Sequence, residues 1–235
     1  MQDVTNLTAK IGRVAVVTGG GGGLGRATAL KLAGQGMVVV AVDRNERNLE
    51  DLPEGISREV FDSTDPSAAA PMMERIAHEV GAPDVLVNTI GTYLSANALS
   101  TTPDQWHLML DINLAPALWL SQAVAPYMQQ RGSGAIVHIA ARQGLEPSTG
   151  ATAYSVSKAA LIHLTRVLDL ELRPSGIRVN AVVPQLIDTA KNRTFIPKEV
   201  MSHAVAPEAI AEVIAFLVSD AAAPVSGAIL PVYGA

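Results

Sequence analysis

Six short runs of the chain are mostly apolar and rich in β-branched residues. They cover residues 14–17, 37–42, 85–87, 135–139, 177–183 and 228–232. A strand covered on both faces has a continuous apolar run, whereas a strand with one wet face alternates apolar and polar residues. The runs therefore predict a buried parallel sheet. Because aromatic residues make up only 4% of the chain, its core must be built from Val, Ile, Leu and Ala.

Helical patterns lie between these runs. Residues 24–34 follow the first run, apolar side chains recur at helical spacing over 72–80 and 209–217, and 153–172 is a long, mostly apolar helix. Strands that alternate with helices favour a doubly wound α/β fold of Rossmann type, with helices on both faces of the sheet. No repeat, low-complexity linker or charge block interrupts this pattern, so we expect residues 1–235 to form a single domain.

The composition excludes several classes of protein. The chain has no cysteine, which excludes a disulfide scaffold, thiolate metal sites and a cysteine nucleophile. The balance of 17 basic and 22 acidic residues gives a net charge of −5, without the positive footprint of a nucleic-acid binder. No uninterrupted apolar run approaches the ~20 residues of a membrane span, and the initial MQDVTNLTAKIGR lacks the apolar core of a secretory signal. We therefore expect a cytoplasmic protein without nucleic-acid or membrane partners.

A run of glycines separates the first predicted strand from the first predicted helix. The sequence TGGGGGLG fits the pattern T-G-x-x-x-G-x-G. Glycine lets the backbone turn tightly and approach a pyrophosphate, and the helix that follows offers unpaired N–H groups and a partial positive charge. The pattern predicts a dinucleotide site, although a flexible turn without a ligand is the alternative. The residues expected around the pyrophosphate are Gly19, Gly22, Gly23, Leu24 and Gly25.

Asp43 ends the second predicted strand, and its charge bears on the choice of cofactor. An acidic side chain at this place binds ribose hydroxyls and repels a 2′-phosphate, which favours NAD over NADP. The next residue, Arg44, leaves NADP open because a guanidinium can pair with a 2′-phosphate. A solvated loop position for Arg44 is an equal alternative. The expected cofactor is NAD, with NADP as the second candidate.

Tyr154 and Lys158 lie four residues apart in the long predicted helix, which places them one turn apart on one face. An ammonium group near a phenol favours the phenolate and lowers the phenol pKa from its usual value of about 10. Such a tyrosine exchanges protons near neutral pH, as hydride transfer to a carbonyl or imine requires. A surface helix pair is the alternative. The position of the pair after the glycine turn and the acidic strand end is what favours catalysis.

With these motifs in this order, the chain resembles the short-chain dehydrogenase/reductase family over nearly its whole length. The resemblance rests on TGGGGGLG, Asp43, Asp62, NTIG at 88–91, DINL around Asn113, YSVSK and RVNAVVP at 178–184. It implies a Rossmann-type sheet of about seven strands, an NAD(P) cofactor, a small-molecule substrate and frequent tetramers. It also implies that Tyr154 is the acid/base and a cofactor contact, that Lys158 tunes its pKa and anchors the nicotinamide ribose, and that Asn113 holds a relay water.

The same resemblance implies cofactor contacts beyond the glycine turn. Asp62 and Ser63 would border the adenine, and Asn88 and Gly91 would line the cofactor groove. The motif NTIG departs from the family pattern at its two middle positions. The residues that would flank the nicotinamide carboxamide are Pro184, Ile187 and Thr189.

One residue of the family pattern is missing. Members of the family carry a catalytic serine after the fifth strand, 13 residues before the tyrosine, and this chain has Ala141 there, preceded by Ala140. The nearest serines do not replace it, because Ser133 precedes the strand and Ser148 is too close to Tyr154. Losing one such hydrogen-bond donor costs about 10²–10³ in rate. A substrate that is already reactive toward hydride would need the donor less.

The alanine and a second segment resemble the dihydropteridine reductases, members of the family that reduce a quinonoid dihydropterin. The segment is IDTAKNR at 187–193, followed by IP at 196–197 and APE at 206–208. Polar residues near the gap could also supply the missing donor, although a solvated loop position is the favoured alternative for each. They are Arg142, Gln143, Ser148, Thr149 and Thr152.

The five histidines are scattered without the spacing of metal ligands, so no metal site is expected. His138 lies within the fifth predicted strand. Because its neighbours are apolar, we expect a hydrogen-bonded core residue and not a catalyst.

Two functions from different classes remain open. The first is an NAD(P)-dependent oxidoreductase that uses Tyr154, Lys158 and Asn113 on a small carbonyl, imine or quinonoid substrate. The second is a redox-silent NAD(P)-binding sensor or scaffold, which Ala141 suggests. Residues 114–128 and 153–172 carry few charges, so we expect these helices to be buried against another subunit in a homodimer or homotetramer. A monomer that tolerates alanine-rich helix surfaces is the alternative.

Overall fold

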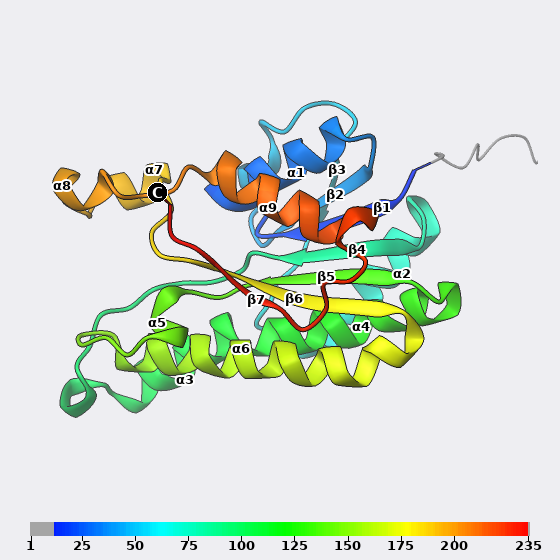
Figure 1. Ribbon diagram of the computed structural model, residues 1–235. Helices are drawn as coiled ribbons and strands as arrows, with labels where there is room; N and C mark the ends of the chain where they lie inside the picture. Colours follow the sequence, from blue (N-terminus) through cyan, green and yellow to red (C-terminus); the bar gives the residue numbers. More distant parts are fainter. Residues whose placement is uncertain (1–11, 235) are drawn as a thin grey trace, which may run out of the picture.

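The structure of the protein, a computed structural model, describes residues 12–234. Seven strands in this range form one parallel sheet in the order β3-β2-β1-β4-β5-β6-β7 (Figure 1). The strands are β1 Val14–Thr18, β2 Val38–Asp43, β3 Ser57–Val60, β4 Pro83–Asn88, β5 Gly134–Ile139, β6 Ile177–Pro184 and β7 Ile229–Val232. The expected doubly wound α/β fold is confirmed.

Each of the six apolar runs overlaps a strand of this sheet, but none of the runs overlaps β3. This strand lies at the edge of the sheet and, among the described residues, pairs only with β2. Its side chains alternate between partly buried and exposed, so its sequence SREV has no continuous apolar stretch. A pattern of continuous apolar runs therefore does not predict this strand.

Helices cover both faces of the sheet (Figure 1). One face carries α1 (Gly23–Gly34) and α9 (Pro207–Val218), which pack over side chains such as Val17. The other face carries α2 (Ala69–Glu79), α4 (Ala115–Arg131) and α6 (Thr152–Leu172), which pack over the intervening side chains such as Val16. The remaining helical segments are α3 Pro103–Asn113, α5 Arg142–Leu145, α7 Ala190–Arg193, α8 Lys198–Met201 and the 3₁₀ turns η1 Glu46–Leu49, η2 Pro66–Ala68, η3 Ala98–Ser100, η4 Arg173–Ser175 and η5 Asp220–Ala222.

The stretch formed by α3 and α4, Pro103–Arg131, is long and apolar enough to cross a membrane by length and composition. Polar residues are scattered through this stretch, so it contains no uninterrupted apolar run of membrane-spanning length. In the structure α4 packs against the sheet through Leu120, Val124 and Met128, all of them fully buried. This is the packing of a core helix.

The strand order places a crevice at the carboxyl ends of β1 and β4. The chain runs from β1 outward to β2 and β3, and then returns to form β4 on the other side of β1. Doubly wound sheets bind ligands where the strand order reverses in this way. Thr18 and Asn88 end the two strands and are direct neighbours in the register. The glycine turn and the motif NTIG therefore begin side by side.

The packing of α1 predicts unequal effects for two leucines of this helix. Leu32 is fully buried in the core beneath α1, whereas Leu30 is 40% exposed. Leu32→Ala should lower the free energy of unfolding by ~2–5 kcal/mol, because it removes buried methyl groups and leaves a cavity. Leu30→Ala should lower it by less than about 1 kcal/mol. Urea denaturation followed by circular dichroism measures both, and equal losses would contradict the assigned core face.

Candidate active site

A cleft of about 750 Å³ opens at the carboxyl ends of β1, β2 and β4. Its volume lies in the range of ~300–1,000 Å³ that is typical of small-molecule sites. Many of the predicted cofactor contacts line it, namely Gly19, Gly22, Gly23, Leu24, Gly25, Asp43, Arg44, Ser63, Gly91 and Thr189. The structure thus brings the glycine turn, the acidic strand end and the loop after β6 to one cavity. The predicted contacts that do not line it are Asp62, Asn88, Tyr154, Lys158, Pro184 and Ile187.

The glycine turn forms a cradle that has no room for side chains. Gly19 has a positive φ of 70°, and a Cβ there would lie 2.6 Å from Oγ1 of Thr89. A Cβ on Gly23 would lie 2.8 Å from the Thr189 methyl group. Helix α1 begins at Gly23, so its first N–H groups have no partner within the helix. A bare turn that leads into a helix N-terminus fits the pyrophosphate of a dinucleotide.

Asp43 holds the glycine turn in place as well as lining the cleft. Its Oδ2 accepts a hydrogen bond from the Gly21 N–H at 3.2 Å. Its Oδ1 accepts from the Asn45 N–H at 3.1 Å and from Nδ2 of Asn48 at 2.9 Å. A carboxylate has about four acceptor sites, so these contacts leave capacity for a ribose hydroxyl. Arg44 lines the same end of the cleft and takes part in none of the ion pairs within residues 12–234.

Asn88 supports the turn from beneath and does not line the cleft. Its Oδ1 accepts from Oγ1 of Thr18 at 2.8 Å and from the Ile90 N–H at 3.2 Å. The neighbouring Thr89 lines the cleft, and its Oγ1 donates to the Thr18 carbonyl at 2.7 Å. The sequence motifs alone did not indicate this role of Thr89. The available signal was the departure of NTIG from the family motif at this position.

In the loops around the cleft, the predicted contacts Asp62, Pro184 and Ile187 do not line the cavity. Asp62 is exposed, and its Oδ1 accepts from the N–H and hydroxyl of Thr64, which lowers the pKa of the carboxyl group. It therefore shapes the loop, while Ser63 and Thr64 line the cleft. After β6, Pro184 is buried and Ile187 forms a bridge with Val205.

Lys158, Asn113 and Gly91 meet at the inner end of the cleft. Lys158 is 4% exposed, and its Nζ donates to the Ile139 carbonyl at 2.8 Å. Asn113 accepts from the Thr92 N–H at 2.8 Å through Oδ1 and donates to Oγ of Ser157 at 3.1 Å. A Cβ on Gly91 would lie 3.1 Å from Oδ1 of Asn113 and 3.2 Å from Nζ of Lys158. Because Gly91 also lines the cleft, it connects the candidate cofactor site with two of the candidate catalytic residues.

The electrostatics of this cluster differ from the expectation for Tyr154. The sequence predicts that Lys158 lowers the pKa of the Tyr154 phenol. In the structure burial, with a smaller contribution from Tyr93, raises the pKa of Tyr154 to about 12. The Tyr93 ring meets the Tyr154 ring edge-on at a centroid distance of 5.0 Å. The expected lowering fails because desolvation favours the neutral phenol, and because the Lys158 ammonium is bonded to the Ile139 carbonyl.

Ala141 is the N-cap of α5 and is 4% exposed. The short helix that follows packs against α6, since a Cβ on Gly144 would lie 2.7 Å from the carbonyl carbon of Lys158. Among the polar residues near the gap, Arg142 pairs with Glu146 at 2.7 Å. Oε1 of Gln143 is buried and has no hydrogen-bond partner within the described residues. Gln143 therefore has an unused polar atom close to the position of the missing serine.

His138 is a core residue, but it is not hydrogen-bonded as the sequence predicts. It is fully buried on β5, and neither ring nitrogen has a partner among residues 12–234. Burial, followed by the charge of Lys158, lowers the pKa of the imidazole to about 3. The same part of the chain contains no group of three His, Asp or Glu side chains that could hold a metal ion.

Comparisons with known proteins place these features in context. The sequence model of the family described as short chain dehydrogenase matches residues 13–200. The chain is 32% identical to 3-oxoacyl-[acyl-carrier-protein] reductase FabG of Thermotoga maritima, over 95% of this chain and 97% of the relative. It is also 32% identical to meso-2,3-butanediol dehydrogenase of Serratia marcescens, over 94% and 93% of the two chains. The crystal structure of gox2181 matches with a TM-score of 0.88, 33% identity and 94% coverage of both chains.

The burial of Lys158 predicts that stability rises with pH. An unfolded lysine keeps its proton up to the usual pKa of 10.5, whereas burial lowers the pKa of folded Lys158 to about 8. Between these values the unfolded state binds more protons, so the free energy of unfolding increases with pH, by on the order of 3 kcal/mol in total. The raised pKa of Tyr154 makes the free energy of unfolding fall with rising pH, but only above pH 10, where the unfolded phenol loses its proton before the folded one.

Urea denaturation at pH 8, 9 and 10 measures this rise in the wild type. Lys158→Met should remove it, because no buried ammonium group remains to be deprotonated. The exposed Lys198 provides a matched control, and Lys198→Met should keep the rise. An equal rise in Lys158→Met would show that another group is responsible.

Proposed function

The chain belongs to the short-chain dehydrogenase family, whose members bind NAD(P), and on this premise we propose that it is an oxidoreductase. In this proposal it transfers hydride to or from a small carbonyl, imine or quinonoid substrate. The observation that carries the proposal is the meeting of Lys158 and Asn113 at Gly91, a residue that also lines the cleft below the glycine turn. This contact supports a single site that combines the cofactor cradle with Lys158 and Asn113.

Tyr154 is the proposed acid/base. NAD(P), when bound, donates or accepts the hydride, and the Tyr154 hydroxyl gives a proton to the substrate oxygen or nitrogen, or takes one from it. With its pKa at about 12, the phenol is protonated at neutral pH and is ready to donate, which suits reduction of the substrate. Oxidation requires the phenolate. In that direction the charge of Lys158, one helical turn away, would have to approach the phenol oxygen.

Lys158 and Asn113 take the supporting roles. Burial lowers the pKa of Lys158 to about 8, so the side chain is mostly charged at pH 7 and can donate to a ribose hydroxyl. The side chain of Asn113 accepts a hydrogen bond from the Thr92 N–H and donates one to the Ser157 hydroxyl. In the proposal it fixes the end of α3 beside Lys158, where a relay water would link the ammonium group to solvent.

NAD is the proposed cofactor. Asp43 lines the cleft at the end of β2, where its negative charge accepts ribose hydroxyls and disfavours a 2′-phosphate. Arg44 lines the same end and is the observation that favours NADP as the alternative. The hydrogen bond from the Gly21 N–H to Asp43 supports NAD, because it holds the carboxylate beside the turn.

The substrate class follows from Ala141. A site without the serine hydroxyl lacks one donor to the substrate carbonyl, so a substrate with high intrinsic reactivity toward hydride is favoured. The resemblance to dihydropteridine reductases points the same way, toward a quinonoid substrate. The relatives named above are, by their names, a reductase of a 3-oxoacyl group and a dehydrogenase of a diol. An ordinary ketone or alcohol is therefore the comparison substrate.

We also infer self-association through the outer face of α6. Val156, Val167 and Leu170 are exposed there, Leu170 to 68%, and their spacing of 11 and 3 residues places them on one side of the helix. Covering them with a second copy would bury apolar surface, which supports a homodimer or homotetramer. A single domain over residues 1–235 and a cytoplasmic location are parts of the same proposal.

The central test compares two tyrosines. Tyr154→Phe should lower the rate of NAD(P)H oxidation with a reactive carbonyl or quinonoid substrate by about 10²–10⁴, because it removes the proton donor. NADH binding, followed by its fluorescence, should stay within about threefold, since Tyr154 does not line the cleft. Tyr127→Phe, on the partly buried face of α4, is the control and should leave both unchanged. Tight NADH binding without turnover of any substrate would favour the redox-silent alternative.

A second test restores the missing hydroxyl. Ala141→Ser should raise kcat/KM with ordinary ketones at least about tenfold, because one donor to the substrate oxygen is worth about 10²–10³ in a working site. Ala140 is equally buried, at 4% exposure for each residue. Ala140→Ser is therefore the control and should give no gain. No gain in either variant would mean that Ala141 is not what limits the use of ketones.

A further inference from the structure

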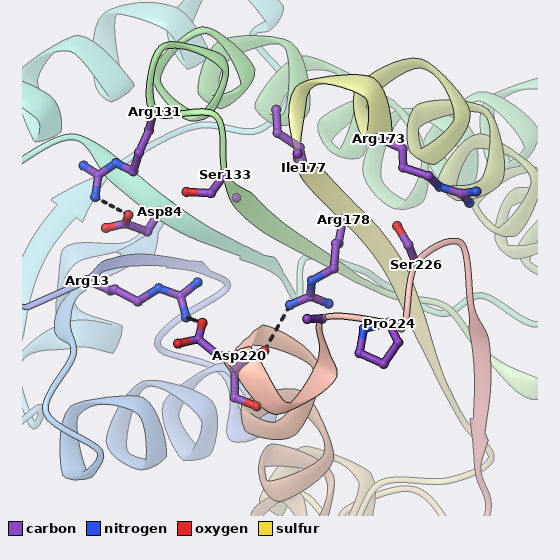
Figure 2. Close-up of a pocket in the computed structure, with 14 residues that line it drawn as sticks. Arg13, Asp84, Arg131, Ser133, Arg173, Ile177, Arg178, Asp220, Pro224 and Ser226 are labelled. Carbon is purple, nitrogen blue, oxygen red and sulfur yellow. Dashed lines mark hydrogen bonds and ion pairs between the residues drawn. The ribbon is translucent and has the colours of Figure 1, made fainter.

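A second pocket, of about 800 Å³, lies at the opposite end of the sheet from the cleft (Figure 2). Its base is formed by Gly134 and Ile177, the first residues of β5 and β6. Its walls come from the segments in which α4, α6 and α9 end. It shares no lining residue with the cofactor cleft. Its volume is that of a small-molecule site.

The pocket carries more positive than negative charge. Arginines at positions 13, 131, 173 and 178 face it, together with Asp84 and Asp220. Arg131 pairs with the buried Asp84. Arg173 pairs with Asp169, which is buried behind the pocket wall. These two pairs are neutral, so the charge of the pocket depends on the remaining arginines and Asp220.

Asp220 is a weakly held carboxylate that pairs with Arg13 and lies near Arg178. Nη1 of Arg13 lies 3.6 Å from Asp220, whose side chain is fully exposed. Arg178 has no carboxylate within 4.0 Å in the part of the chain that the structure describes. Burial and the charge of Arg13 lower the pKa of Arg178, and Asp220 offsets this only in part. One partly buried guanidinium group therefore has no counter-ion of its own.

Hydrogen bonds to backbone carbonyls use only some of the N–H donors of Arg13 and Arg178. Arg178 donates to the Val225 carbonyl at 3.0 Å and to the Ser219 carbonyl at 3.2 Å. Arg13 donates to the Val218 carbonyl at 2.8 Å, at the end of α9. Each guanidinium group has five N–H donors, so donors remain on both. Capping the end of α9 explains why arginines are present, but it does not neutralise the surplus charge.

We propose that this pocket binds a small anion that carries phosphate or carboxylate groups, held by Arg13 and Arg178. Figure 2 shows the two side chains approaching Asp220 from different sides. An anion between them would replace Asp220 as the counter-ion, and guanidinium groups bind phosphate and carboxylate oxygens in a bidentate manner. The site is separate from the proposed cofactor and substrate sites and does not depend on them.

Calorimetric titration of the full-length protein with pyrophosphate, at constant ionic strength, tests the proposal. Arg178→Gln should weaken binding at least about tenfold, because it removes a charge-assisted contact. Asp220→Asn should tighten binding about threefold or more, since it removes the competing carboxylate. Arg166 is exposed on α6 and outside the pocket, so Arg166→Gln should change the affinity less than twofold. A purely structural role of the arginines does not predict the gain in Asp220→Asn.

Two controls distinguish binding in this pocket from unfolding of a variant and from binding at the glycine turn. Arg13→Gln is a second variant for the case that Arg178→Gln unfolds, because Arg13 supports a single carbonyl; it should also weaken binding. Pyrophosphate could instead occupy the glycine turn, so the titration is repeated with saturating NADH. Binding that disappears with NADH would overturn the proposal, and so would equal weakening in Arg178→Gln and Arg166→Gln.

Discussion

The pairing of β1 with β4 is the constraint on which the site depends. Thr18 and Asn88 end these strands as direct neighbours, and their side chains are hydrogen-bonded to each other. Thr89 adds a second bond to the Thr18 carbonyl and fills the space beside Gly19. The glycine turn and the segment leading to Gly91 are thereby fixed against each other. Any residue larger than glycine at 19 or 91 would disturb this arrangement, at one end beside Thr89 and at the other beside Lys158.

Burial controls the chemistry at the inner end of this arrangement. It lowers the pKa of Lys158 and raises that of Tyr154, and in both cases it disfavours the charged form. The two groups therefore oppose the ion pair that a four-residue spacing predicts. The Lys158 ammonium group donates to the Ile139 carbonyl at 2.8 Å, which uses one of its three N–H donors. In the proposed reaction, proton transfer by Tyr154 would therefore depend on how closely the Lys158 ammonium group approaches the phenol.

Patterns that depend on neighbours in the sequence were predictable, and those that depend on neighbours in space were not. The buried strands and the glycine turn follow from apolar runs and from backbone freedom, which are local properties. Edge strand β3 has no continuous apolar run, because its side chains alternate between partly buried and exposed. The contact of Tyr93 with Tyr154, and the lack of a partner for His138 within residues 12–234, depend on side chains brought together by the fold. The sign of the Tyr154 shift was wrong for the same reason, since spacing along a helix says nothing about desolvation.

The two ends of the sheet present helix ends of opposite polarity, with N–H groups at one end and carbonyl groups at the other. In a doubly wound fold the helices run against the strands, so they begin at the carboxyl end of the sheet and finish at its amino end. At the first end, the start of α1 offers N–H groups and a positive dipole end, and the cleft can hold a pyrophosphate mainly through backbone. At the other end, carbonyl groups at and after the end of α9 need donors, and Arg13 and Arg178 supply them. The carboxyl end of a helix is equivalent to only about half a unit of negative charge, whereas each arginine carries one full positive charge, so positive charge is left over. The surplus at the amino end therefore follows from the direction of the helices, and the arginine pocket is its consequence.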